Sequence, residues 1–162
     1  SYRGEWGEFD RGVTTVSEMV PRISRRTGLS EAEVRAVVDA VPDELQPIDD
    51  SVRLLGALRE RGPRLHYLSN MPAPRADHLS HRHAFLKLFD SGIYSSHVKI
   101  TKPDPAIFTL AQQRFGGDPA DTLFIDDHPE NIEAALRHGW QARLFTGPQA
   151  MADELRALGL ID

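Results

Sequence analysis

The spacing of apolar residues changes part-way along the chain. Up to about residue 45, apolar positions recur every three or four residues, which is the period of a helix with one buried face. The two sets with this spacing are Val16, Met19, Val20 and Ile23, and then Val34, Val37, Val38 and Val41. We therefore expect residues 1–45 to be all-helical, with residues 1–12 irregular or weakly helical.

Start and stop signals delimit these two helices. Segments 15–18 and 30–33 both begin with Ser or Thr and end in Glu, the spacing of a capping box, in which two side chains bond backbone N–H groups at the start of a helix. Gly28 is expected to end the first helix and Pro42 the second.

From about residue 50 onward, short apolar runs of strand length alternate with helical patterns. Strands are predicted over residues 64–69, 92–94, 122–126 and 141–145. Helices are predicted over residues 51–61, 75–88, 105–115, 129–139 and 151–158. Asp50 is expected to cap the first of these helices and Asp104 the third. This alternation is typical of βαβ units and a parallel sheet.

The sequence thus predicts an α/β fold: a Rossmann-like parallel sheet flanked by helices, with a small helical part at its N-terminal side. The segment from Pro42 to Pro47 separates the two patterns. We expect one domain over residues 1–45, which is helical, and a second over residues 46–162, which contains the sheet.

Composition narrows the classes of partner. The 162 residues are 40% hydrophobic and 27% charged, with a net charge of −5 and no cysteine. A mildly acidic chain without a basic cluster is a poor binder of nucleic acid or anionic membranes. Disulfides and cysteine chemistry are excluded, and no apolar run reaches the length of a membrane span. We expect a cytoplasmic protein; its oligomeric state has no signal in the sequence.

Polar residues follow the predicted strands at the edge where parallel sheets bind ligands. Ser69 and Asn70 follow one strand, and Asp126 and Asp127 follow another. Lys102 lies on the intervening loop, directly before a helix. Two adjacent carboxylates suit Mg²⁺, which takes one or two protein carboxylates with water and phosphate oxygens.

Each of these residues also has a plain structural interpretation. Asp127 or His128 can cap the helix that begins at Pro129, leaving Asp126 in solvent. Ser69 and Asn70 can form an ordinary turn, and Lys102 can be a surface lysine. The combination, with each residue at its place in a βα pattern, favours a common site.

In this combination the chain resembles the haloacid dehalogenase superfamily, most of whose members are Mg²⁺-dependent phosphatases. Residues 68–70 (Leu-Ser-Asn) resemble the second motif of that family, and residues 102–108 (Lys-Pro-Asp-Pro-Ala-Ile-Phe) the third. Residues 123–139 resemble the fourth, including its Asn, Ala and Gly positions. Residues 6–12 are similar to the start of the small helical cap of bacterial sugar-phosphate phosphatases related to the α-D-glucose-1-phosphate phosphatases.

The resemblance implies a role for each residue. Ser69 and the Asn70 amide would bind the phosphoryl group, and Lys102 would neutralise it and help to hold the nucleophile. Asp126 and Asp127 would hold Mg²⁺. In the cap over residues 1–45, the residues expected to face the substrate are Trp6, Phe9 and Arg11.

The family's first motif, Asp-x-Asp after an apolar strand, is not found in this chain. Its first Asp is the nucleophile that forms a phospho-aspartyl enzyme. Asp10 lacks the second Asp, and we expect it to lie in a cap turn. The chain starts at Ser1 rather than Met, so we expect the central first strand and the nucleophile to lie upstream, and these 162 residues alone to be inactive.

The resulting hypothesis is a Mg²⁺-dependent phosphatase of a small metabolite phosphate, with a sugar phosphate as the leading substrate. A non-catalytic member that binds phosphate or a partner protein is the alternative that the missing motif supports. A phosphomutase or a haloacid dehalogenase shares the scaffold, although a dehalogenase has no need of the Asp pair.

Overall fold

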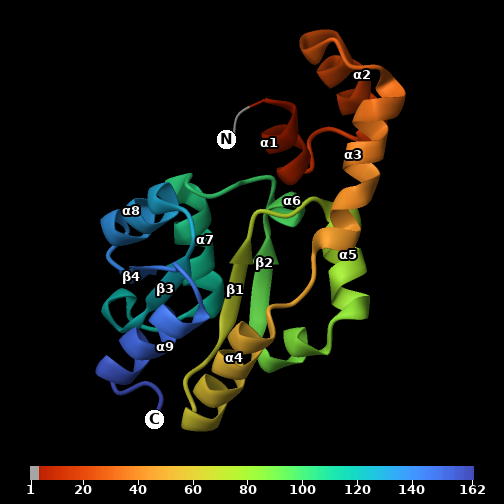
Figure 1. Cartoon of the computed structure of the whole chain (residues 1–162). Helices are drawn as coiled ribbons and strands as arrows, with labels where there is room; N and C mark the ends of the chain where they lie inside the picture. Colours follow the sequence, from red (N-terminus) through yellow and green to blue (C-terminus); the bar gives the residue numbers. More distant parts are fainter. Residues whose placement is uncertain (1–3) are drawn as a thin grey trace. The chain divides into compact units, whose positions relative to one another are not determined.

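The computed structural model describes residues 4–162, apart from the side chains of residues 42–44 and 81, and it confirms the α/β class (Figure 1). The first four elements are helices: α1 (Glu5–Asp10), α2 (Val16–Thr27), α3 (Glu31–Glu44) and α4 (Asp49–Arg61). The middle elements are β1 (His66–Ser69), α5 (Ala73–Arg82), the 3₁₀ turn η1 (Ala84–Leu88), β2 (Ser91–Tyr94) and α6 (Ser95–Val98). The last are α7 (Pro105–Phe115), η2 (Pro119–Asp121), β3 (Leu123–Asp126), α8 (Pro129–Arg137), β4 (Gln141–Leu144) and α9 (Pro148–Ala157).

The strands in the described part of the chain pair as two two-stranded sheets. β1 pairs with β2, and β3 pairs with β4. The β3–β4 pair is parallel, with Leu123 opposite Gln141 and Asp126 opposite Leu144. That an upstream central strand completes the sheet stays a prediction.

Helices cover both faces of β3, as in a doubly wound fold. Successive side chains of a strand point to opposite faces. Leu123 and Ile125 pack with the cluster that α9 forms with Leu54, Ala57 and Leu58 of α4. Phe124 instead meets Phe108 of α7, edge to face, with ring centroids 5.6 Å apart. Asp126, two residues further on, is thereby placed at the carboxyl end of a strand that is packed on both sides.

The chain divides into two compact units. One contains the residues up to Gln46 together with 68–83 and 93–102; the other contains 47–67, 84–92 and 103–162. The strands β1 and β2 run through both units, so the units are not simple sequence blocks. The assignment of domains to residues 1–45 and 46–162 stays a prediction.

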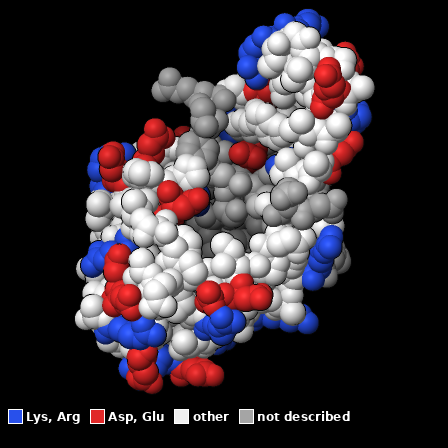
Figure 2. Space-filling view, in the orientation of Figure 1, with Lys and Arg blue, Asp and Glu red and all other residues white. Residues whose placement is uncertain are grey.

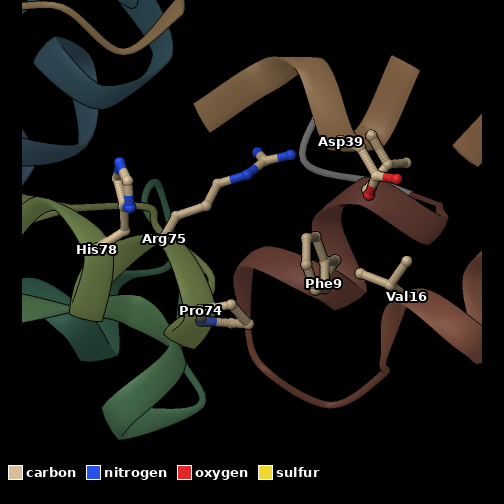
Figure 3. A pocket seen from close by; sticks show the side chains of 7 residues that line it. Phe9, Val16, Asp39, Pro74, Arg75 and His78 are labelled. Carbon is tan, nitrogen blue, oxygen red and sulfur yellow. The ribbon is translucent and has the colours of Figure 1, made fainter. Parts of the chain in front are cut away.

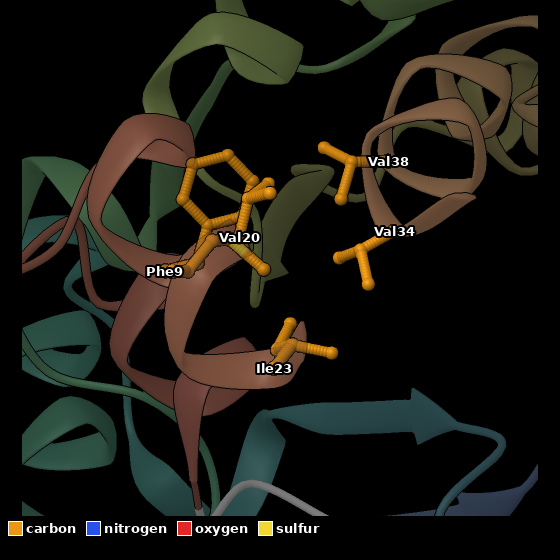
Figure 4. Packing of buried hydrophobic residues seen from close by; sticks show 6 residues of the cluster. Phe9, Val20, Ile23, Val34 and Val38 are labelled. Atoms are coloured by element: carbon orange, nitrogen blue, oxygen red, sulfur yellow. The ribbon is translucent and has the colours of Figure 1, made fainter. Parts of the chain in front are cut away.

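Helices α1, α2 and α3 enclose a small apolar core (Figure 4). Its buried members are Phe9, Met19, Val20, Ile23, Val34 and Val38. Each fully buried side chain of this size contributes about 1.5–3 kcal/mol. Glu8 and Arg22 add an ion pair with two hydrogen bonds, at 2.5 and 3.1 Å, which joins α1 to α2.

Most local signals are confirmed. The Thr15–Glu18 capping box has both of its bonds, and Ser30 and Glu33 make the same reciprocal pair. Gly28 ends α2 in the left-handed conformation. The Asp104 side chain accepts a hydrogen bond from the N–H of Ala106 and so caps α7.

Of the two forms predicted for residues 1–12, irregular or weakly helical, the structure has the helix over 5–10, whose Phe9 face is held in the core just described. Three local predictions are wrong. α3 continues past Pro42 to Glu44, because a proline in the last turn removes only one bond. Ile48, not Asp50, precedes α4; Asp50 lies in its first turn, where a carboxylate favours the helix dipole.

The third is the helix predicted over 75–88. It breaks at His83, whose backbone is extended, and continues as η1. η1 packs against α4, and this tertiary contact replaces the last turns of a longer helix.

The surface carries mixed charge. On the face in Figure 2, acidic and basic side chains are interspersed. Among the described residues, no helix combines the length and apolar character that crossing a bilayer requires.

Candidate active site

The loop after β1 is fastened to the loop before α7 through one side chain. The amide Nδ2 of Asn70 donates to the carbonyl oxygen of Lys102 at 3.0 Å, and its Oδ1 accepts from the N–H of Lys102 at 2.8 Å. Both bonds are partly buried. The sequence predicted that the main chain of Asn70 binds a ligand; the structure adds that its side chain fixes the backbone of the candidate phosphate-binding lysine.

Ser69 and Lys102 have the placement that the sequence predicted. Ser69 is the last residue of β1 and is partly buried. Lys102 is buried, with 8% of its surface exposed, so it is not the solvated surface lysine of the alternative interpretation. A cation at a buried position acts more strongly on a nearby anion than one in water, because the local dielectric is lower.

A buried serine links this loop to α1. The hydroxyl of Ser95, the first residue of α6, accepts from the N–H of Met71 at 2.9 Å and donates to the carbonyl of Asp10 at 2.5 Å. Ser95 is fully buried. The sequence analysis missed it, although its position directly after β2 is the kind of strand end at which polar residues were sought.

α6 also explains a glycine. Gly12 has a φ of 66°, and a Cβ there would lie 3.0 Å from the carbonyl oxygen of Ser96. The ammonium of Lys99 donates to the Gly12 carbonyl at 2.5 Å. The end of α1 therefore rests closely on α6.

The Asp126 carboxylate is held in one orientation by its neighbours. Its Oδ1 accepts from the N–H of His128 and from Nδ2 of Asn131, both at 2.9 Å. Asp126 is 9% exposed and Asn131 is 1% exposed. These buried bonds exclude the alternative in which Asp126 is simply solvated.

Asp127 and His128 complete a group of possible metal ligands. Nδ1 of His128 lies 2.9 Å from Oδ1 of Asp127. His128 is the residue directly before α8, but its side chain makes no capping hydrogen bond to the helix, and its own N–H donates to Asp126. Ligand atoms of Asp126, Asp127 and His128 all lie within 4.8 Å of one another.

The two halves of the candidate site belong to different compact units. Ser69, Asn70 and Lys102 are in the first unit, and Asp126 and Asp127 are in the second. Within each unit the structure brings the residues together as described. Their convergence on one ligand stays a prediction.

The three predicted cap residues lie on α1 or at its end. Trp6 and Phe9 meet edge to face, with centroids 6.4 Å apart, and Arg11 is the residue directly after the helix. Phe9 is mostly a core residue. The sequence analysis missed Arg75 of α5, whose guanidinium lies 5.4 Å from the ring centroid of Trp6 and 5.5 Å from that of Phe9.

Asp10 ends α1 and does not follow a strand. Burial raises the pKa of its carboxyl to about 6, although the cations Arg75 and Arg11 oppose the shift. Its place at the end of a helix matches the expected cap turn.

Comparison with known proteins fixes the family. Residues 13–139 match the haloacid dehalogenase-like hydrolases, which is well over half of the chain. The chain belongs to the haloacid dehalogenase-like hydrolases. The resemblance inferred from its motifs is thus confirmed, and so is the Rossmann-like fold.

Individual members of the family are similar over most of the chain. A sesquiterpene phosphatase of Aspergillus oryzae is 29% identical over 154 residues, covering 94% of this chain and 78% of the relative. A family enzyme of Bacteroides thetaiotaomicron, crystallised with magnesium and inorganic phosphate, has a TM-score of 0.68 and 25% identity, covering 86% of this chain and 74% of that one. The chain spans less than half the length of several other curated relatives.

The haloacid dehalogenase-like fold also serves another reaction. The L-2-haloacid dehalogenase of Xanthobacter autotrophicus has a TM-score of 0.64 and 19% identity, covering 97% of this chain and 66% of that one. At this identity the likeness shows the fold alone.

Proposed function

We propose that the full-length protein is a Mg²⁺-dependent phosphatase of a small organic phosphate. The observation that carries the proposal is the Asp126 carboxylate, fixed by Asn131 and the His128 N–H at the carboxyl end of β3, with Asp127 beside it. The magnesium and phosphate in the Bacteroides family member support the same chemistry.

The donor set fits the proposed ion. Mg²⁺ prefers oxygen ligands and usually takes one or two protein carboxylates. Asp126 and Asp127 supply them, and Asn131 orients the first. When bound there, the ion would stabilise negative charge on the transferring phosphoryl group.

The first unit supplies the proposed phosphoryl site. Ser69 offers a hydroxyl, and Asn70 offers its main-chain N–H. The side chain of Asn70 keeps the Lys102 backbone fixed, so the ammonium starts from a defined place. A positioned cation of this kind lowers the energy of a transition state whose charge develops on phosphoryl oxygens.

We also propose that an Asp upstream of Ser1 is the nucleophile and forms the phospho-aspartyl intermediate. No Asp-x-Asp occurs in the 162 residues. Among the described strands, β1 and β3 each have a single partner, so each has one edge that an added strand can pair with. The 162 residues alone are then expected to turn over no phosphate ester.

Two substrate classes are candidates within this function. The cap resemblance favours a sugar phosphate, whereas the Aspergillus relative is a phosphatase of a sesquiterpene. The two substrate classes differ in the polarity of the alcohol that hydrolysis releases. Both are small phosphorylated metabolites, for which we propose a cytoplasmic enzyme.

The test is phosphate release by the full-length protein from a panel of monophosphates, after chelation and readdition of Mg²⁺. We expect hydrolysis that depends on Mg²⁺ and falls at least about 10²-fold in Asp126→Asn. Asp121→Asn is the matched control, because Asp121 is exposed and precedes β3 at its opposite end.

Other results would replace this proposal. Full phosphate release without divalent ions would contradict the proposed role of Mg²⁺. Cleavage of a carbon–halogen bond in place of phosphate esters would favour the dehalogenase chemistry of the Xanthobacter neighbour. Binding of inorganic phosphate without turnover of any ester would favour the non-catalytic alternative.

A further inference from the structure

The first compact unit contains a pocket between α5 and the three N-terminal helices (Figure 3). Its volume is about 230 Å³. The lining residues are Phe9, Val16, Val38, Asp39, Pro74, Arg75 and His78. All of them lie in the same unit, so the pocket does not depend on how the two units are arranged.

We propose that this pocket selects phosphate esters with an apolar organic group, and that Arg75 donates a hydrogen bond to an oxygen of the bound ester. The inference rests on the proposed phosphatase function and names its substrate class.

The walls of the pocket are mostly apolar. Phe9, Val16 and Val38 form the side made by α1, α2 and α3, and Pro74 lies opposite on α5. Sugar hydroxyl groups that face these four side chains would lose water without gaining partners there, whereas a hydrocarbon loses nothing. Since a cavity of about 150 Å³ accepts benzene, this one has room for roughly nine carbon atoms.

Arg75 provides a charged donor that can orient a mostly apolar ligand. Its side chain extends from α5 toward the other wall of the pocket (Figure 3). Its Nη2 is buried and has no hydrogen-bond partner within the described part of the chain. A buried donor in this state favours a ligand that brings an acceptor oxygen.

The pocket has charged and titratable lining residues besides Arg75. His78 lies one turn beyond Arg75 on α5, and Asp39 lies on α3. The carboxylate of Asp10, at the end of α1, attracts the Arg75 cation. Burial lowers the pKa of Arg75, so the cation gains from an added anion or acceptor.

One wall of the pocket follows the candidate phosphoryl site closely along the chain. Pro74 is four residues after Asn70, and four residues of extended chain span at most about 14 Å. An ester with its phosphoryl group at Asn70 is therefore close enough to place its organic group near the wall formed by α5.

The test uses the full-length protein and two monophosphates, geranyl monophosphate and glucose 6-phosphate. We expect kcat/KM to be at least about tenfold higher for the geranyl ester, since one unsatisfied hydroxyl in an apolar site costs that much or more. Val16→Thr and Val38→Thr keep the side-chain shape but add a hydroxyl, and each should lower kcat/KM for the geranyl ester about tenfold, so that the ratio of kcat/KM for the geranyl ester to that for glucose 6-phosphate falls.

Val37→Thr is the matched control. Val37 is on the same helix as Val38 but is 57% exposed and does not line the pocket. Its substitution should therefore leave kcat/KM unchanged for both substrates. Arg75→Lys keeps the charge and removes the forked guanidinium, and it should raise KM for the geranyl ester several-fold.

The outcomes separate this inference from the function on which it rests. A preference for glucose 6-phosphate, or equal effects of Val37→Thr and Val38→Thr, overturns the apolar pocket and leaves the phosphatase intact. If neither ester is hydrolysed, the proposed function fails, and calorimetry with geraniol decides the pocket. Geraniol binding with a negative heat-capacity change that is lost in Val16→Thr supports it, and no binding overturns it.

Discussion

The side chain of Asn70 makes two hydrogen bonds to the backbone of Lys102, a residue thirty-two positions further along the chain. An amide side chain can bond the N–H and the C=O of one residue at the same time only when the distance between the two loops is fixed. Residues of the family's second and third motifs are thus joined by a contact that is independent of any ligand.

Asn70→Ala removes both of these bonds and leaves two backbone groups of Lys102 without them. We expect the free energy of unfolding to fall by about 2 kcal/mol and kcat/KM to fall at least about tenfold. Urea denaturation and phosphate release measure the two effects. Asn70→Asp keeps the acceptor but turns a carboxylate oxygen toward the Lys102 carbonyl, so it should also be less stable than the wild type. Wild-type behaviour of Asn70→Ala would contradict the role given to this side chain.

Asn131→Ala removes a buried donor from Asp126. Groups that orient a metal ligand typically contribute 10–100-fold to affinity, so the Mg²⁺ concentration for half-maximal activity should rise by about that factor. A Mg²⁺ titration of activity measures it. Gln113→Ala, which truncates an exposed amide on α7, is the control and should leave the titration curve in place. An unchanged Mg²⁺ requirement in Asn131→Ala would separate Asn131 from metal binding.

Ser95→Ala and Ser96→Ala test the contact between α1 and the loop after β1. The Ser95 hydroxyl bonds both Met71 and Asp10, whereas the buried Ser96 Oγ has no hydrogen-bond partner among the described residues. We expect Ser95→Ala to lower the free energy of unfolding by about 1–3 kcal/mol and Ser96→Ala to have little effect or to stabilise. Thermal unfolding of the two variants measures this difference. Equal losses of stability in both variants would show that the Ser95 hydrogen bonds contribute nothing beyond burial of the side chain.

Asp10 predicts a pH-dependent contribution to stability. Its pKa is raised in the folded state, from 3.8 to about 6, so folding favours the protonated carboxyl. The contribution is present below about pH 4 and is lost as pH rises through about 6. Asp10→Asn should therefore stabilise the protein at pH 7.5 by about 1 kcal/mol, allowing for solvent screening at this half-buried site, and by nothing near pH 3.5. Urea denaturation at the two pH values measures this, and a pH-independent difference would contradict it.

Local signals predicted a structural feature correctly where all the residues that determine it lie within about one helix turn. The Thr15–Glu18 box and the left-handed Gly28 depend on residues within a few positions of each other. Predictions that depended on the rest of the molecule were wrong. The break at His83 follows from packing of η1 against α4, and the sequence around residue 83 contains no signal that predicts this contact.

The candidate site divides in the same way. Residue type and position, at a strand end or on the loop before a helix, marked Ser69, Lys102 and the Asp pair as candidates. The side-chain bonds of Asn70, the buried hydroxyl of Ser95 and the place of Arg75 over Trp6 join segments that lie far apart in the chain. Spacing along the sequence carries no information about such partners.

The Ser95 hydroxyl has a second acceptor within reach. Besides the Asp10 carbonyl at 2.5 Å, the Met71 carbonyl oxygen lies 3.5 Å from the same Oγ. Rotation about one C–O bond can redirect the proton from one carbonyl to the other. If the helix that ends at Asp10 swings away, the serine keeps a partner, so detaching that helix is cheaper in energy than the short bond alone suggests.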